Sequence, residues 1–290
     1  MADVEIIAEK CTCCGLCAEV CIRGILQMTG KAIETVNPAR CNRCGHCVAV
    51  CPEDAIMPAG MDPLRFERLP KEGLKPDPDW VLRFLRSRRS VRHYQDKPVP
   101  RPILERVLDA SRYAPSGGNR QPWHIVVVQG KESLDRVIDL TVRRIRTRIN
   151  EGLQAVHEAQ ARGEEPPLAA RVYADYLPTV ERIENAWKQG KDDLFYGAPV
   201  IVTIHTPDLG QTMREDASYA AMYMILMAES LGLGTLLNGW FQDASRTVRE
   251  LRDFLRIPQG NQVQVGFALG YPRIRFLRLV DRNPLRVTWV

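Results

Sequence analysis

The chain has 290 residues, 45% of them hydrophobic and 26% charged, with a formal net charge of +5. This composition can bury a full core, so we expect one large domain or two unequal domains rather than a disordered protein. No run reaches the roughly 18 uncharged apolar residues of a membrane span. The N-terminus also lacks the basic and apolar regions of a secretion signal, so we expect a soluble protein of the reducing cytoplasm.

The cysteines are confined to one short region. All nine lie between residues 11 and 51, and the 239 residues after Cys51 contain none, which is unlike the spread of a disulfide scaffold. Eight of them form two copies of the pattern C-x2-C-x2-C-x3-C at a constant offset of thirty residues: Cys11, Cys14, Cys17 and Cys21, then Cys41, Cys44, Cys47 and Cys51. This spacing is typical of bacterial iron–sulfur proteins, and Pro52 closes the second copy as it does there.

Zinc is the alternative occupant, because CxxC pairs also build tetrahedral structural sites. A doubled four-cysteine run fits zinc poorly, since a zinc site needs only four ligands in two pairs. Cys13 is left over, and we expect it to be a small buried apolar residue rather than a ninth ligand. His46 lies inside the second run, where a solvated or cluster-tuning imidazole is expected because the cysteine set is already complete.

Residues 1–60 resemble the two-cluster bacterial ferredoxins. The resemblance implies two [4Fe–4S] clusters that exchange one ligand, because the fourth cysteine of each run binds the cluster of the other. One cluster then takes Cys11, Cys14, Cys17 and Cys51, and the other takes Cys41, Cys44, Cys47 and Cys21.

A proline-rich connector is expected at 61–80, so the predicted domains are 1–60 and 81–290. The positive charge belongs to the larger part, since residues 61–290 carry 35 Lys/Arg against 28 Asp/Glu. No aromatic-interleaved basic stripe or zinc-finger spacing accompanies this charge, so we expect no nucleic-acid partner.

The larger part predicts helices and strands in an irregular order. Hydrophobic spacing indicates a helix capped by Asp79, a helix at 102–114, a buried strand at 123–130, a helical charge-rich insertion at about 131–195, a strand at 198–205, a helix at 216–234 and a final strand near 262–272. This order favours an α+β fold with a mixed sheet flanked by helices. There is no G-x-G-x-x-G motif to support a dinucleotide-binding domain.

Four ordered segments carry a second resemblance: RRSVRHYQDKPVP, APSGGNRQPWHIVVV, SLGLGTLLNGWF, and ALGYP followed by RNPLRVTW. Together they are similar to the FMN-dependent nitroreductase family. The resemblance implies a nitroreductase-like domain that binds FMN through Arg88, Arg89, Ser90, Arg92, Pro115, Ser116, Asn119, Asn238, Gly239 and Arg282. It also implies a homodimer with FMN at the interface.

The predicted ferredoxin-like part and the predicted FMN-binding part are compatible in the number of electrons they handle, since each cluster passes one electron and a flavin stores two. We therefore expect a flavin-dependent oxidoreductase that passes electrons from the clusters to FMN and on to a small electrophile such as a nitro compound, quinone or activated alkene. No side chain needs to act as a nucleophile. Three points stay open: whether the donor is a ferredoxin-type protein or NAD(P)H, whether the chain is instead a non-enzymatic electron-transfer or redox-sensing subunit, and whether the 131–195 insertion is a substrate lid or a docking surface.

Overall fold

The computed structural model describes residues 4–290, which form two compact units. Unit 1 extends to Pro76 and also includes Ser116–Arg120. Unit 2 comprises Asp77–Pro115 and Gln121–Val290. The division at 76/77 lies within the segment where the sequence predicts a connector, and most of that connector belongs to unit 1.

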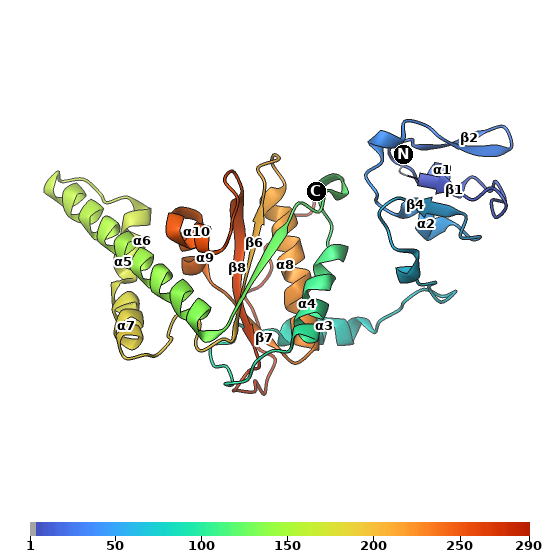
Figure 1. Ribbon diagram of the computed structural model, residues 1–290. Helices are drawn as coiled ribbons and strands as arrows, with labels where there is room; N and C mark the ends of the chain where they lie inside the picture. Colours follow the sequence, from blue (N-terminus) through green and yellow to red (C-terminus); the bar gives the residue numbers. More distant parts are fainter. Residues whose placement is uncertain (1–3) are drawn as a thin grey trace. The chain divides into compact units, whose positions relative to one another are not determined.

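Unit 1 is built from two short antiparallel sheets and two single-turn helices (Figure 1). Its elements are β1 (Val4–Ile6), α1 (Leu16–Glu19), β2 (Leu26–Thr29), β3 (Ala32–Thr35), α2 (His46–Val50) and β4 (Ile56–Pro58). Strand β1 pairs with β4, and β2 forms a hairpin with β3. The buried core is small, consisting of Val4, Cys17, Leu26, Ile33 and Ile56.

The thirty-residue repeat of the sequence is also a repeat of backbone conformation. Four pairs of positions thirty residues apart have a left-handed backbone: 13 and 43, 15 and 45, 24 and 54, 30 and 60. In both copies a glycine in this conformation precedes the short helix, because glycine adopts positive φ without a steric penalty. The two cysteine runs therefore fold into two similar loops.

Unit 2 contains one four-stranded sheet and eight helices among its described residues. The strands are β5 (His124–Gln129), β6 (Val200–Thr206), β7 (Gly234–Leu237) and β8 (Gln262–Gly270). The helices are α3 (Pro78–Ser87), α4 (Arg101–Asp109), α5 (Lys131–Ala161), α6 (Leu168–Asp175), α7 (Leu177–Lys188), α8 (Met213–Ser230), α9 (Gly239–Thr247) and α10 (Arg249–Phe254).

The sheet has the strand order β5-β6-β8-β7 and lies between two helical layers (Figure 1). All three pairings of named strands are antiparallel. The parallel component of the predicted mixed sheet is an isolated bridge between Ser90 and Thr235. Every residue of β6 is buried, because helices cover both faces of this central strand.

The two layers of the core follow from the alternation of side chains along β6. Val200, Val202 and Ile204 pack in one hydrophobic cluster with α4 and α8, whereas Ile201 packs in the other with α5 and α9. The helical insertion 131–195 thus contributes to the second layer through α5. Among residues 4–290, no helix is both long and apolar enough to cross a membrane.

One local prediction was wrong. Helix α3 is capped by Asp77 rather than Asp79, since the Asp77 carboxylate accepts a hydrogen bond from Asp79 N at 3.0 Å. Pro78 then occupies the first helical position, where its missing N–H is not needed. The sequence contains two Pro-Asp steps here, at 76–77 and 78–79, and either aspartate could have been the cap.

Gly234 allows strand β7 to approach the segment that carries Ser90. A Cβ at this position would lie 2.3 Å from Val91 Cγ2 and 2.9 Å from Val91 Cβ. We expect Gly234→Ala to lower the free energy of unfolding by about 1–3 kcal/mol because the added methyl group overpacks this contact. Chemical denaturation measures the change. Gly239→Ala is the control, since a Cβ there meets nothing within 4 Å; an equal loss in both variants would contradict the packing argument.

Candidate functional site

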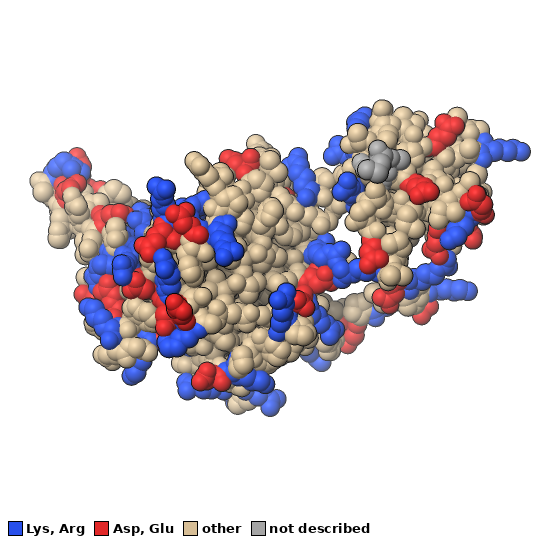
Figure 2. All heavy atoms as spheres, viewed as in Figure 1, with Lys and Arg blue, Asp and Glu red and all other residues tan. Residues whose placement is uncertain are grey.

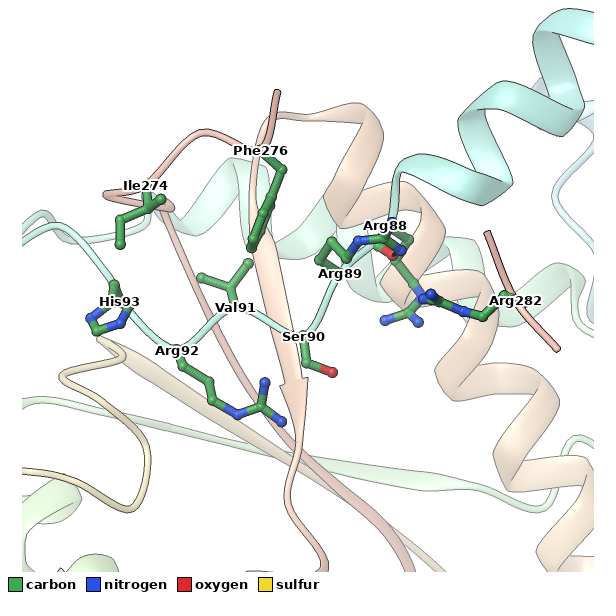
Figure 3. Close-up of a pocket in the computed structure, with 9 residues that line it drawn as sticks. All are labelled: Arg88, Arg89, Ser90, Val91, Arg92, His93, Ile274, Phe276 and Arg282. Carbon is green, nitrogen blue, oxygen red and sulfur yellow. Dashed lines mark hydrogen bonds between the residues drawn. The ribbon is translucent and has the colours of Figure 1, made fainter. Parts of the chain in front are cut away.

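A cavity of about 470 Å³ in unit 2 brings five predicted FMN-binding residues together. Arg88, Arg89, Ser90, Arg92 and Arg282 all line it (Figure 3). The other lining residues are Val91, His93, Ile274 and Phe276. The volume is in the range of small-molecule sites, and the lining combines four guanidinium groups with an apolar side.

The cavity is suited to an anion because its lining contains four arginines and no aspartate or glutamate. Arg89 gives the clearest indication of an anion site, because its Nη2 atom is buried and has no hydrogen-bond partner among the described residues. Its Nη1 atom only donates to the neighbouring Arg88 carbonyl at 3.3 Å. A buried N–H group without an acceptor is costly, and a phosphate oxygen would satisfy Nη2.

Backbone pairing fixes the position of the arginine segment. The chain leaves the C-terminus of α3 at Arg88 and runs beside β7, where Val91 N donates to Thr235 O at 2.9 Å. Arg282 comes from the extended C-terminal segment that follows β8 (Figure 3). Residues almost 200 positions apart in sequence thereby line one cavity.

The segment continues into a buried tyrosine. Tyr94 is 7% exposed, and its hydroxyl has no partner among residues 4–290. Burial raises the pKa of this hydroxyl, although the nearby Arg92 acts in the opposite direction. Tyr94 therefore stays neutral and packs in the hydrophobic core cluster that also contains Val91.

Asn238 and Gly239 do not line the arginine cavity, but they begin α9 directly after the strand that pairs with Ser90. Both polar atoms of the Asn238 side chain are used. Its Oδ1 accepts from Phe241 N at 3.0 Å, and its Nδ2 donates to Leu194 O at 3.0 Å. Gly239 is the first helical residue, so its N–H has no acceptor within the helix. The position that a Cβ would take at Gly239 is open, with no atom within 4 Å.

We expect Asn238→Ala to lower the free energy of unfolding by about 1–3 kcal/mol, because it removes a helix cap and leaves the Leu194 carbonyl without its donor. Asn238→Ser separates the two effects, since its hydroxyl oxygen can still cap α9 and only the donor to Leu194 O is lost. Denaturant unfolding of both variants should therefore show a smaller loss for Asn238→Ser. Unchanged stability in the alanine variant would contradict this structural role.

The remaining predicted residues are not among those that line the cavity. Pro115 is exposed and belongs to unit 2, whereas Ser116 and Asn119 belong to unit 1. Within unit 1, Asn119 Nδ2 donates to the carbonyl oxygens of Asn42 at 3.0 Å and Arg43 at 2.9 Å. The structure thus places the Asn119 amide against the second cysteine loop.

Sequence reasoning missed four lining residues. Val91 and His93 stand inside the quoted RRSVRHY segment, so their proximity to the arginines could have indicated them. Ile274 and Phe276 belong to an irregular stretch with no periodicity, and no sequence signal identified them. Together with Val91 they form the apolar side of the cavity.

Unit 1 contains two cavities that are each surrounded by cysteines. Cavity A is lined by Cys11, Cys13, Cys14, Cys17 and Cys51, and cavity B by Cys21, Cys41, Cys44 and Cys47. Each cavity thus receives three cysteines from one run and the fourth from the other run. These are the two crossed sets implied by the ferredoxin resemblance.

Backbone amides point at several of the sulfur atoms. Ile25 N lies 3.2 Å from Cys21 Sγ, and Ala55 N lies 3.2 Å from Cys51 Sγ. In the case of Cys21, burial alone would raise the pKa, but backbone hydrogen bonds from residues 23–26 lower it overall. Such bonds stabilise a thiolate, which is the form that binds iron, so this donor set fits an iron–sulfur cluster.

Two other cysteines, Cys47 and Cys13, differ from Cys21 in the effect or the extent of their burial. Burial raises the pKa of Cys47 to about 11, so binding to metal there must release a proton. Cys13 is only half-buried and has a left-handed backbone with φ of 56°, so the prediction that it is a buried core residue was wrong. Across residues 4–290, no three Cys, His, Asp or Glu side chains are arranged to hold a single metal ion.

The helical insertion packs against α9. Tyr176 makes an edge-on contact with Trp240 at 5.3 Å between ring centroids, and Arg148 donates to Tyr173 OH at 3.1 Å. Its surface carries interleaved charges of both signs (Figure 2), including the pairs Arg143–Asp139 and Arg146–Glu184. The insertion is thus anchored beside the start of α9, where Gly239 lies.

Residues 85–271 match the nitroreductase family, and residues 34–57 match the 4Fe-4S binding domain. This chain belongs to the nitroreductase family. It is therefore an FMN-dependent oxidoreductase by family, and it carries a ferredoxin-like iron–sulfur domain ahead of the reductase part. The expected α+β nitroreductase fold is confirmed.

Named relatives agree with this assignment. The 4-nitrobenzoate reductase of a Nocardioides species is 32% identical over 201 residues, which is 65% of this chain and 78% of that protein. The NADH dehydrogenase of Thermus thermophilus is 29% identical over 192 residues, covering 64% of this chain and 83% of that protein. A crystal structure of Bacteroides fragilis nitroreductase with bound FMN has a TM-score of 0.52 at 21% identity, over 72% of this chain and 98% of that one.

Proposed function

We propose that this protein carries single electrons through two [4Fe–4S] clusters to FMN and reduces an electrophilic small molecule, such as a nitro compound, a quinone or an activated alkene. The observation that carries the proposal is the presence, in one chain, of two cavities, each lined by three regularly spaced cysteines of one run and the fourth cysteine of the other, and of a third cavity lined by arginines. When bound, FMN would collect two electrons, one at a time, together with a proton, and transfer them as a hydride.

The residues of the chain have distinct tasks in this proposal. Arg89, with its unsatisfied buried Nη2, neutralises the FMN phosphate together with Arg88 and Arg282. Ser90 donates a hydroxyl hydrogen bond. Val91, Ile274 and Phe276 shield the site from water, which strengthens the charge-assisted bonds.

In unit 1, the proposal assigns Cys11, Cys14, Cys17 and Cys51 to the cluster of cavity A. It assigns Cys21, Cys41, Cys44 and Cys47 to the cluster of cavity B. Backbone N–H groups donate hydrogen bonds to the sulfur atoms of Cys21 and Cys51, so the fourth ligand of each cluster is stabilised in the same way. A reducing, cytoplasmic setting suits such clusters, because their thiolates must not be oxidised.

We further propose a homodimer with FMN at the interface. Helix α8 supports this, because Tyr219, Met222 and Tyr223 are between 40% and 48% exposed and recur at helical spacing on one face. The C-terminal segment adds further exposed apolar side chains: Leu285, Val287, Trp289 and Val290. An exposed apolar surface of this kind marks an interaction site.

A comparison of electron donors tests the proposed function. The full chain is reconstituted anaerobically with iron, sulfide and FMN, and substrate reduction is followed with NADH, NADPH or reduced ferredoxin as the donor. Reduction of nitro, quinone or alkene substrates with reduced ferredoxin supports the proposal. Activity only with NADH or NADPH favours the second candidate, a nicotinamide-fed reductase, which the name of the Thermus relative also favours. Absence of substrate reduction with every donor points to an electron-transfer subunit.

A further inference from the structure

Cavities A and B differ in the charges that line them. Among residues 4–290, cavity B is lined by Arg23 and Arg43 and by no acidic residue. Within the same described range, cavity A is lined by Glu53 and by no basic residue. Two cavities formed by a repeated sequence thus differ in the sign of their local charge.

The turns that follow the fourth cysteines show where the difference arises. After Cys51 the chain reads Pro52, Glu53, Asp54, whereas after Cys21 the matching positions are Ile22, Arg23 and Gly24. Arg68 compensates Asp54, since its Nη2 lies 2.6 Å from the Asp54 carboxylate, but Glu53 remains. The turn beside cavity A is therefore negative, and the turn beside cavity B is positive.

Hydrogen bonds to sulfur do not offset this difference. The bonds to the two fourth ligands are equal, at 3.2 Å from Ile25 N to Cys21 and at 3.2 Å from Ala55 N to Cys51. Cavity B has one further bond, from Arg43 N to Cys41 Sγ at 3.4 Å. Amide donors and nearby positive charge both stabilise the additional electron of a reduced cluster, so the two effects act in the same direction.

We propose that the cluster in cavity B has the higher reduction potential of the two and accepts the first electron. This inference rests on the proposed function, because it requires a cluster in each cavity. An electron that enters at cavity A then passes to cavity B, so that the cluster in A is oxidised and the cluster in B is reduced. Arg23, Arg43 and Glu53 act as tuning residues through their charge, without binding iron.

A potentiometric titration of the reconstituted full chain, followed by electron paramagnetic resonance, tests this assignment. We expect two reduction waves. Arg23→Gln should lower the potential of the earlier wave, and Glu53→Gln should raise that of the later wave. Each substitution should change the ratio of the two reduced clusters at a given potential by about two- to threefold, as expected for one solvent-screened charge.

Control variants keep the test specific. Arg23→Lys retains the charge and should restore the wild-type titration. Lys31→Gln removes an exposed charge from the β2–β3 turn, outside both cavities, and should leave both waves in place. Raising the salt concentration should narrow the gap between the waves, because the tuning charges are exposed.

The failures of the two proposals are distinguishable. Suppose that two clusters assemble, but Arg23→Gln shifts the later wave, shifts both waves equally or shifts neither. This result would overturn the assignment of cavity B and leave the proposed function standing. A wild-type chain that assembles fewer than two clusters, measured by its iron content, would overturn both. Loss of iron in Arg23→Gln that Arg23→Lys restores would show that the charge supports assembly of the cluster and would overturn a purely tuning role.

Discussion

Replacement of Arg89 by glutamine is expected to weaken FMN binding about 100-fold, which corresponds to about 2.7 kcal/mol. The reason is that Nη2 of Arg89 is buried in a cavity that no acidic side chain of residues 4–290 lines, and it has no partner in that range, so its interaction free energy is available to the ligand. A charge-assisted bond to phosphate is stronger than a neutral one, and its loss falls almost entirely on binding. Fluorescence titration of the apoprotein with FMN measures the effect.

Stability provides an independent check on this variant. Because the buried Nη2 atom of Arg89 has no acceptor among residues 4–290, Arg89→Gln should leave the midpoint of thermal unfolding of the apoprotein unchanged or raise it. Arg106→Gln is the matched control, since Arg106 is exposed on α4 outside the cavity, and FMN affinity should be unaffected. If Arg89→Gln bound FMN as tightly as the wild type, the arginine cavity would not be the phosphate site.

Replacement of Cys51 by serine is expected to remove one cluster completely. The iron content should fall from about eight to about four atoms per chain, because each [4Fe–4S] cluster needs four ligands. The crossed arrangement further predicts which thiols are released, namely Cys11, Cys14 and Cys17, which line cavity A with Cys51. Alkylation of the native holoprotein followed by peptide mass spectrometry identifies them.

The reciprocal variant and a control sharpen this result. Cys21→Ser should release Cys41, Cys44 and Cys47 instead, since these line cavity B. Cys13→Ser should retain both clusters, because the two sets of four are complete without it. Labelling of Cys41, Cys44 and Cys47 in Cys51→Ser would mean that each run binds its own cluster.

Residue spacing predicted the cysteine loops well, because local geometry alone decides them. Three cysteines separated by two residues, with a glycine after the second, specify one loop whatever the surrounding fold. The arginine segment was predicted less directly, since an Arg-Arg pair at a helix end is usually solvated. The prediction that this segment binds FMN depended on its order along the chain relative to three other segments.

Other features could not be predicted because they depend on tertiary contacts. Ile274 and Phe276 line the cavity from an irregular segment, and nothing in their spacing distinguishes them from other exposed apolar residues. Asn119 lies in a flavin-binding motif by resemblance, yet its amide binds two carbonyl groups of the second cysteine loop. Such long-range pairs arise from the packing of distant segments and leave no local pattern.

The most direct test of the account is the rate of flavin reduction when electrons are supplied to the clusters. Anaerobic stopped-flow mixing of the FMN-loaded chain with reduced ferredoxin follows the cluster and flavin absorbance together. We predict that the clusters are reduced first and the flavin afterwards, and that the flavin rate falls at least about tenfold in a Cys17→Ser/Cys47→Ser variant, which lacks one ligand in each cavity. Flavin reduction at the same rate in that variant, or an oxidised flavin beside fully reduced clusters, would contradict the account.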